Sequence, residues 1–564
     1  MSERSTKDRP ETHQLLVERY RVIDGSTLRN MVGASVDWLR TNQQLVNALN
    51  VFPVPDGDTG TNMVLTMQSA SDEIVENSER SVGRVAHAIA HGALMGARGN
   101  SGVILSQLWR GFARALDEHD RMDAALLAEA LDEACQTAYK GVVRPVEGTI
   151  LTVSKDIASE AKVALQNGAS SAFEILDIVV QAADASVEHT PELLPVLKEA
   201  GVVDSGGKGL FFILEGMLRA AYRQPLDQPI ISVQPLSAIN LNSAVDAIEP
   251  GQDWEVIVDF RPEETLDLQK FYTSLEGLGT SIQVGEGDGM YRMHIHVADE
   301  NEYEPIEYIK GLGTITNVAI ENLMIQMDDS AGPSDIQDIA LQAIEPGQNA
   351  VVAVAPGMGL ARVFASLGAT AIIEGGQTMN PSTQEILNSF EDLPTDKVIL
   401  LPNNKNIVLA ANQAAELTVK RVTVIPSVSV PQGIAAMFAW EPGGDFNTVS
   451  ESMAGTLNDV QTAEITTATR SVEIDGVTCE AGQVIGLLNG KLACSGDTLE
   501  KVLVETIEKA DTASRELITL YYGEDLSAMD ANQLGDRIRE LYSEQELEVH
   551  EGGQPHYQLI LSIE

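Results

Sequence analysis

Three apolar stripes with the repeat of an α-helix run through residues 23–222, and each adjoins a glycine-rich segment. A side chain that recurs every third or fourth residue lies on one face of a helix, so each stripe predicts an amphipathic helix. We therefore predict an all-α domain over residues 23–223, with its loops gathered at one end. The stripes are Leu28, Val32, Val36 and Leu39; Ile104, Leu108, Phe112 and Leu116; and Leu210, Leu214, Met217 and Leu218.

The remainder of the 564 residues is too long for one further core, and its pattern changes along the chain. The polar residues 1–22 predict a flexible tail, and residues 224–250, with four prolines, predict a linker. Strand-like runs at Trp254–Phe260 and Tyr291–Val297 predict a small α+β domain over 251–330. In residues 345–564, apolar runs at 350–355, 397–401 and 421–425 alternate with helix-like stretches. This alternation predicts an α/β region with a mainly parallel sheet.

The charge balance excludes some classes of partner. The chain has 37 basic and 83 acidic residues, a net charge of −46, which argues against binding to nucleic acid or to an anionic membrane surface. No apolar run approaches the roughly 20 residues that a membrane-spanning helix needs, so no membrane insertion is expected. The three cysteines, Cys135, Cys479 and Cys494, are too scattered for a disulfide framework, and we expect a cytoplasmic protein.

An acidic loop, NVFPVPDGDTGTN, spans residues 50–62. Its two prolines exclude a helix, and Asp56 and Asp58 flank a glycine. Hard cations such as Mg²⁺ prefer carboxylate oxygens and retain room for the phosphates of a substrate. The alternative is a surface turn, because aspartate and glycine are the usual residues of turns.

Further glycine-rich segments precede helix-like stretches: GARGNSG (96–102), EGT (147–149) and VDSGGKG (203–209). Small residues allow backbone N–H groups to approach an anion, and the positive end of a helix dipole favours it. Each segment alone is a weak signal, and GARGNSG alone is more typical of an ordinary helix cap. Together with the acidic loop they predict a phosphate and metal site, although the chain has no GxxxxGK[ST] motif.

These motifs resemble a known family. NALNVFPVPDGDTGTNM, GARGNSG, PVEGTILTV and LPVLKEAGVVDSGGKGL are similar to the DhaL-type ATP-binding domain of dihydroxyacetone kinases. IIEGGQTMNPST (372–383), LPNNKNIVLAANQAA (401–415), VPQGIAAM (430–437) and GGQPHYQLILSIE (552–564) resemble the catalytic subunit of bacterial fatty acid kinases. The resemblance covers nearly the whole chain after residue 22.

The resemblance implies an eight-helix bundle that holds ATP and two Mg²⁺ ions at its loop end. Asp56 and Asp58 match the family's metal-binding carboxylates, and Asn50 is the nearest counterpart of a third aspartate. The positions that match nucleotide-contacting loops are Gly60, Thr61, Asn62, Asn100, Ser101, Gly102, Thr149, Asp204 and Gly206.

His294 and His296, in the middle domain, are two residues apart in a predicted strand, so both imidazoles face the same side. Related proteins carry a matching histidine pair with a cysteine as a zinc partner, but here Ile257 stands about where that cysteine would be. Asp259 or Glu255 is a possible substitute. Zinc bound by this pair and a hydrogen-bonded structural pair are the alternatives, and the missing thiolate favours the structural pair.

The resemblance implies a kinase subunit that converts a fatty acid carboxylate to an acyl phosphate, with the fatty acid presented by a separate DegV-type binding protein. Its C-terminal region would receive that partner, and a homodimer is expected. Because a carboxylate is already ionised at neutral pH, no general base is required, and His87 and His91 are expected to be dispensable. The alternatives are a dihydroxyacetone kinase component and a regulator that binds nucleotide without turnover.

Overall fold

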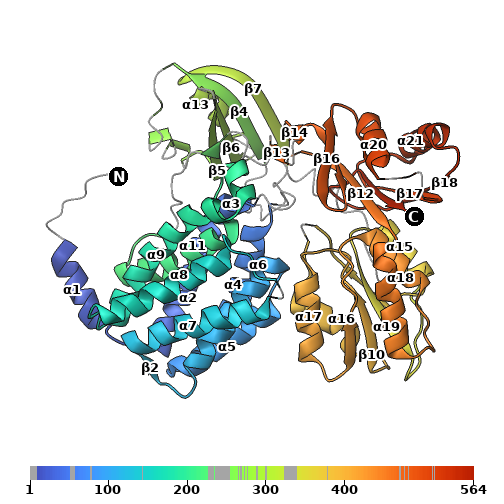
Figure 1. The fold of residues 1–564 in the computed structure, drawn as a ribbon. Coiled ribbons are helices and arrows are strands. Elements are labelled where there is room, and N and C mark those ends of the chain that lie inside the picture. Colours follow the sequence, from blue (N-terminus) through green and yellow to red (C-terminus); the bar gives the residue numbers. More distant parts are fainter. Residues whose placement is uncertain are drawn as a thin grey trace.

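The computed structural model contains three parts: a helical bundle, a small middle domain and a C-terminal region with two sheets (Figure 1). This arrangement confirms the predicted multidomain fold class, all-α followed by α+β and α/β. The structure describes residues 9–50, 57–75, 79–142, 144–226, 234–235, 254–322 (without 264–265, 267–269, 272–273, 276, 288–289 and 299–300) and 339–564 (without 378, 469–471, 475–476, 481, 511 and 513–514).

Eight helices of 14 or more residues form the bundle within the described part of residues 25–222. Their apolar faces meet around Trp38, Phe173 and Phe212, and the predicted stripe from Leu28 to Leu39 is buried in α2. The short helices α3 (Gln43–Ala48) and α10 (Pro195–Ala200) and the strand pair β1 (Ile23–Asp24) and β2 (Arg121–Met122) complete it. The eight helices are α2 (Gly25–Thr41), α4 (Thr59–Val75), α5 (Val82–Met95), α6 (Gly99–Ala115), α7 (Ala124–Gly141), α8 (Ile150–Gln166), α9 (Ala172–Leu193) and α11 (Ser205–Tyr222).

The N-terminal segment differs from its prediction. Helix α1 (Arg9–Arg19) lies within the segment expected to be a flexible tail, residues 1–22, and Leu16 is buried against the bundle. The His13 ring packs edge-on against Phe173, with centroids 5.4 Å apart. The prediction of a flexible tail is wrong for residues 9–22. The segment is polar overall, so its composition gave no signal of the single face, with Leu16 and His13, that packs on the bundle.

The middle domain is a five-stranded sheet in the order β3-β5-β6-β4-β7, covered by α13 (Glu304–Lys310). Neighbouring strands are antiparallel except for the pair β3 and β5. Strand β3 lies within the predicted linker, 224–250; residues 227–233 and 236–250 of that linker lie outside the described residues. The strands are β3 (Gln234–Pro235), β4 (Trp254–Pro262), β5 (Thr280–Gly287), β6 (Met290–Val297) and β7 (Gly313–Asn322).

The first sheet of the C-terminal region is parallel, in the order β11-β10-β8-β9, as the alternating pattern predicts. Its strands are almost wholly apolar because helices cover both faces. The strands are β8 (Asn349–Ala355), β9 (Ala371–Glu374), β10 (Lys397–Leu401) and β11 (Arg421–Val424). The helices are α15 (Met358–Ser366), α16 (Thr383–Glu391), α17 (Val408–Leu417), α18 (Val430–Phe438) and α19 (Phe446–Gly455), followed by η3 (Thr456–Asn458).

The second sheet has the order β16-β15-β12-β19-β17-β18 and a core of its own. Its neighbouring strands are antiparallel, except for the parallel pair β17 and β18. The elements are β12 (Gln461–Thr467), β15 (Val484–Leu488), β16 (Lys491–Gly496), α20 (Leu499–Lys509), β17 (Leu517–Tyr522), α21 (Ala528–Leu541), β18 (Glu546–Glu551) and β19 (Leu559–Ile563), with the separate hairpin β13 (Val472–Ile474) and β14 (Val477–Cys479).

The bundle and the parallel sheet are packed together. Figure 1 shows α17 beside α6, and Ala97 and Val103 of the bundle share an apolar cluster with Ile386, Phe390 and Ile407. All five side chains are at most 2% exposed. The C-terminal region is therefore seated on the glycine-rich end of α6.

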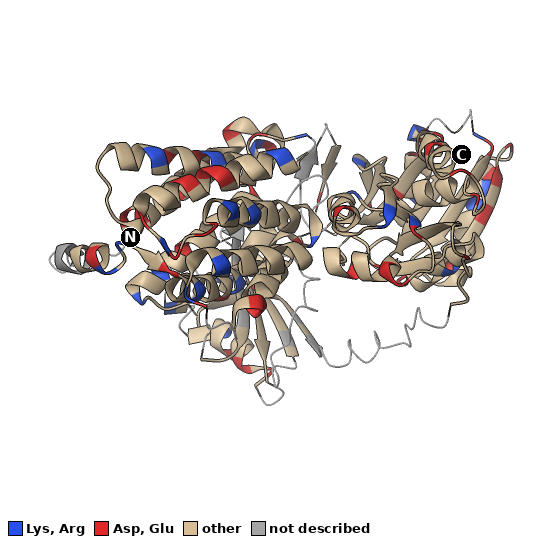
Figure 2. Ribbon diagram, turned by 90° about the horizontal axis from the view of Figure 1, so that it is seen from below, with Lys and Arg blue, Asp and Glu red and all other residues tan. Residues whose placement is uncertain are grey.

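Acidic residues are spread over the helices and strands of all three parts rather than gathered on one element (Figure 2). In the part of the chain that the structure describes, no helix combines the length and the apolar character that crossing a membrane requires.

Candidate phosphate and metal site

Four helix N-termini meet at one end of the bundle. Thr59, the first residue of α4, accepts a hydrogen bond from Ser205, the first residue of α11, over 3.2 Å. A Cβ on Gly99, at the start of α6, would lie 2.6 Å from the Asn62 amide of α4. A Cβ on Gly206 would lie 3.3 Å from Ile150, the first residue of α8. The positive ends of four helix dipoles thus converge, an arrangement that favours an anion.

Asp204 joins two of these helix starts. Its carboxylate accepts the backbone N–H of Gly207 at 2.6 Å and caps α11. The same carboxylate also accepts a backbone hydrogen bond from Ile150, at the start of α8. Burial raises the pKa of Asp204 to about 6, against the two backbone hydrogen bonds, which lower it. The side chain predicted to contact nucleotide therefore also fixes the geometry of the two loops.

Asp58 is buried at the start of α4, with 7% of its surface exposed. Three asparagine amides donate to its carboxylate: Asn50 over 3.2 Å, Asn62 over 2.8 Å and Asn380 over 2.6 Å. Asn50, predicted as a counterpart of a metal-binding aspartate, thus contacts Asp58 directly. Asp56, the other predicted metal ligand, lies outside the described residues.

The predicted residues Gly60, Thr61 and Asn62 form the first turn of α4. The Thr61 hydroxyl accepts from Gln43 over 3.0 Å and from Asn47 over 3.1 Å, and the Thr61 N–H donates back to the Asn47 side-chain oxygen over 3.1 Å. A Cβ on Gly60 would overlap the Gln43 carbonyl oxygen. Gln43 and Asn47 therefore hold the first turn of α4. No sequence motif marked these two residues as part of the site, although their spacing of four residues places both on one helix face.

Asn100, Ser101 and Gly102 lie in the first turn of α6, as predicted. Gly102 is required by packing, because a Cβ there would overlap the Thr66 hydroxyl. The Asn100 amide donates to the Asn406 side-chain oxygen of the C-terminal region over 3.1 Å. Asn100 therefore has a contact between domains that the sequence did not predict.

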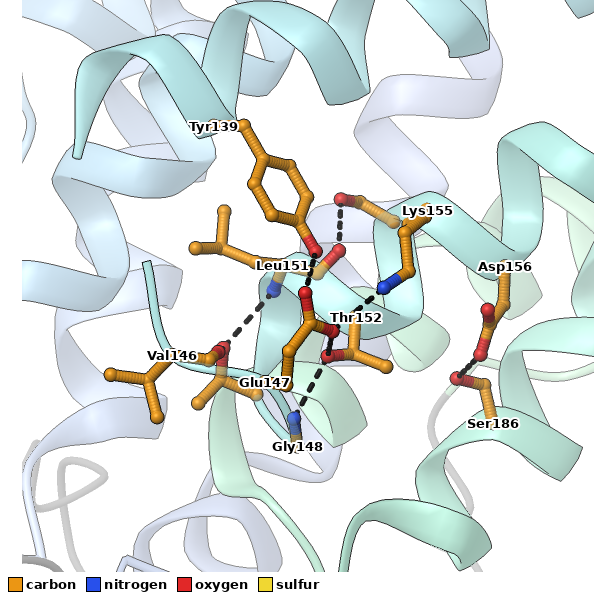
Figure 3. Close-up of polar contacts among 11 residues, drawn as sticks. Tyr139, Val146, Glu147, Gly148, Leu151, Thr152, Lys155, Asp156 and Ser186 are labelled. Atoms are coloured by element: carbon orange, nitrogen blue, oxygen red, sulfur yellow. Dashed lines mark hydrogen bonds and ion pairs between the residues drawn. The ribbon is translucent and has the colours of Figure 1, made fainter. Parts of the chain in front are cut away.

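Thr149 caps α8 through a hydrogen bond from the Leu151 N–H, over 3.3 Å. Glu147 holds the loop before this cap, and Figure 3 shows its carboxylate among Tyr139, Thr152 and Lys155. Tyr139, Thr152 and Lys155 donate hydrogen bonds to the Glu147 carboxylate over 3.1, 2.7 and 2.8 Å, respectively. The hydrogen bond from Lys155, and to a lesser extent that from Thr152, lowers the pKa of Glu147. Burial, and to a lesser extent the hydrogen bond to Glu147, raises the pKa of Tyr139 to about 12. This network fixes the start of α8.

The donor set is suited to a magnesium–phosphate ligand. A buried carboxylate stands beside carbonyl-bearing amides, which are oxygen ligands of the kind that Mg²⁺ prefers. The adjoining N–H groups and glycines allow phosphate oxygens to approach the backbone.

The middle domain contains the predicted histidine pair. His294 and His296 lie on β6, buried, with ring centroids 5.1 Å apart. Ile257, on the neighbouring strand β4, is paired with His294, so it stands at about the position where the resemblance would place a cysteine. Asp259 is bound by Arg292 through two hydrogen bonds of 2.5 and 2.7 Å. Among the described residues, no group of three or more His, Cys, Asp or Glu is arranged to hold a metal ion. The structural pair, favoured over zinc from the sequence, remains a prediction.

An apolar cavity of about 90 Å³ lies in the core of the bundle, lined by residues such as Leu28, Leu108, Trp109 and Met217. An engineered protein cavity of about 150 Å³ holds a single benzene molecule. The cavity is thus too small for a long acyl chain in this conformation.

The sequence is similar to known protein families and to individual proteins. Residues 350–564 match the FakA-like C-terminal model of the fatty acid kinases, 249–330 the FakA-like middle domain, and 53–219 the DAK2 domain. Protein YloV of Bacillus subtilis is 39% identical over 562 residues, covering 96% of this chain and 100% of that protein. The chain belongs to the FakA-like family of fatty acid kinase proteins.

Other relatives of this FakA-like protein were found. An uncharacterized protein of Staphylococcus aureus (strain USA300) is 36% identical, covering 96% of this chain and 99% of that protein. A crystal structure of a DegV family protein from Corynebacterium glutamicum matches 38% of this chain and 96% of its own, with 16% identity and a TM-score of 0.30, too low to support a structural argument. The family matches indicate a member of a kinase family that belongs to the fatty acid kinase system.

Proposed function

We propose that this chain is the ATP-dependent subunit of a fatty acid kinase and that it binds Mg-ATP at the loop end of its bundle. The observation that carries the proposal is the convergence of four helix N-termini beside the buried carboxylate of Asp58. That combination suits a polyanion bound together with a hard cation. The family membership supports the same chemistry.

In the proposed reaction, a carboxylate oxygen of the fatty acid bonds to the γ-phosphorus while the bond to the bridging oxygen of ADP breaks. The products are an acyl phosphate and ADP. Mg²⁺ supplies charge neutralisation on the phosphates when bound. Asp58, Asp56 and Asn50 would hold it, and the N–H groups at the starts of α4, α6, α8 and α11 would hold phosphate oxygens.

We further propose that a separate DegV-type protein presents the fatty acid. The apolar cavity in the bundle core, about 90 Å³, is too small for a long acyl chain, which supports a lipid held elsewhere. The C-terminal region would receive this partner, because loops on an α/β scaffold commonly carry binding. Its polar loops 401–406 and 552–557 are themselves mostly buried, with His556 exposed.

The test is acyl phosphate formation with Mg-ATP by the chain co-purified with its fatty-acid-binding partner. Asp58→Ala is expected to lower the rate by at least about a hundredfold, the scale for removal of one electrostatic stabiliser. Asp37→Ala is the control, because Asp37 is exposed on α2 and pairs only locally with Arg40.

The alternatives give different results in the same assay. Phosphorylation of dihydroxyacetone in place of fatty acid would identify a dihydroxyacetone kinase component. Nucleotide binding without acyl phosphate, in the presence of every fatty-acid-binding partner of the host, would identify a non-catalytic regulator.

A further inference from the structure

A residue of the C-terminal region lies in the candidate site of the bundle. Asn380, just before α16, is 3% exposed, and its amide nitrogen donates to the Asp58 carboxylate over 2.6 Å. The two residues are 322 positions apart in the sequence. A Cβ on Gly99, at the start of α6, would lie 3.7 Å from the same amide nitrogen. Asn380 therefore stands between Asp58 and the glycine-rich start of α6.

The chemistry of this contact determines how the Asn380 amide is oriented. An ionised carboxylate only accepts hydrogen bonds, so the NH₂ group must face Asp58, and the side-chain oxygen is directed elsewhere. This oxygen is buried and has no hydrogen-bond partner among the described residues. A buried carbonyl without a partner costs free energy, and a hard cation is one ligand that would satisfy it.

The backbone around Asn380 is fixed to the bundle. Arg98 donates to the Asn380 carbonyl oxygen over 2.9 Å, and the Thr383 N–H donates to the Ala97 carbonyl over 3.1 Å. Arg98 also forms an ion pair with Glu385 over 3.0 Å. These contacts do not use the Asn380 side chain, so changing that side chain leaves the docking contacts in place.

We propose that the C-terminal region completes the Mg-nucleotide site, and that Asn380 is its positioning residue. The Asn380 NH₂ group orients the Asp58 carboxylate, and its side-chain oxygen faces the bound cation or a water molecule of its shell. This inference rests on the proposed binding of Mg-ATP in the bundle. It assigns the C-terminal region a role in nucleotide binding that is separate from binding a partner protein.

The test measures binding to the full-length chain by calorimetry, with a non-hydrolysable ATP analogue at a series of Mg²⁺ concentrations. Asn380→Ala removes the amide, and Asn380→Leu removes it while retaining a branched side chain with the same number of non-hydrogen atoms. Asn388→Ala is the matched control, because Asn388 is an exposed asparagine on the neighbouring α16. Thermal melting of each variant checks that the chain is folded.

Both Asn380 variants are expected to bind the analogue about tenfold more weakly at low Mg²⁺, the scale of one hydrogen bond to a charged group. Their affinity should recover as Mg²⁺ is raised, which a general loss of structure would not produce. Wild-type affinity in both variants would refute the inference and leave the proposed function standing. Tighter binding would also refute it, because Asn380 would then obstruct the site. No binding by the wild-type chain would refute both.

Discussion

Arg98 of the bundle and Glu385 of the C-terminal region form an ion pair 3.0 Å long at the edge of the candidate site. Glu385 also completes the capping box of α16 with Ser382. Burial opposes ionisation of Glu385, but the Ser382 backbone N–H and then Arg98 outweigh it and lower its pKa. The same carboxylate thus starts a helix and attaches that helix to the bundle.

Arg98→Ala is predicted to loosen the docking of the two parts. The loss of free energy of docking should be about 1–2 kcal/mol, because Arg98 also donates to the Asn380 carbonyl. Glu385→Gln should cost less than about 1 kcal/mol, because half of that side chain is exposed. Hydrogen exchange of residues 97–103 and 383–390 measures the effect. Arg114→Ala, which removes an exposed ion pair within the bundle, should leave this exchange unchanged. Equal exchange in Arg98→Ala and Arg114→Ala would contradict the prediction.

Gly60→Ala is predicted to destabilise the bundle by about 1–3 kcal/mol, because the added methyl overlaps the Gln43 carbonyl oxygen. The turn that carries Asp58 must then shift. Gly33→Ala is the matched control: no atom lies within 4 Å of its added methyl in the interior of α2, so it should stabilise by about 0.5–1 kcal/mol. Calorimetric melting of the two variants should therefore move in opposite directions from the wild type.

The stability of the bundle is predicted to fall as the pH rises through about 6. The folded pKa of Asp204, about 6, lies above its ordinary value of 3.8, so between these values the folded state holds a proton that the unfolded state has lost. The contribution is complete below pH 3.8 and is lost above pH 6. Asp204→Asn should remove this part of the pH dependence of melting. A wild-type profile with no change between pH 4 and 7 beyond that of the variant would show the prediction to be wrong.

His87→Ala and His91→Ala are predicted to leave acyl phosphate formation within about tenfold of the wild type. Both rings are more than half exposed on α5, near Asp117 and Glu73 respectively. A fatty acid carboxylate is ionised at neutral pH and needs no base. Initial rates with saturating Mg-ATP and partner decide the point, with Asp58→Ala as the comparison. A loss as large as that of Asp58→Ala would require a catalytic histidine.

The sequence alone determined which segments form helices and which form strands, because short-range patterns of residues encode secondary structure. The stripes in α2, α6 and α11 and the apolar runs of β8 and β10 were predicted and are present. The glycine-rich helix starts were also recognisable, since a helix N-terminus needs small residues or caps within a few positions. Asp58, Asn62 and Asp204 were selected for this reason, with the family resemblance, and they lie among the converging helix starts.

Only the tertiary structure decided which distant side chains meet there. Asn380 reaches Asp58 across 322 residues, and neither segment carries a local signal for the other. The packing of α6 against α17 brings them together, through Ala97, Val103 and the apolar face of the parallel sheet. Hydrophobic patterning fixes which face of an element is buried, but not which partner buries it. That choice depends on the shape and the hydrogen bonds of the assembled surfaces.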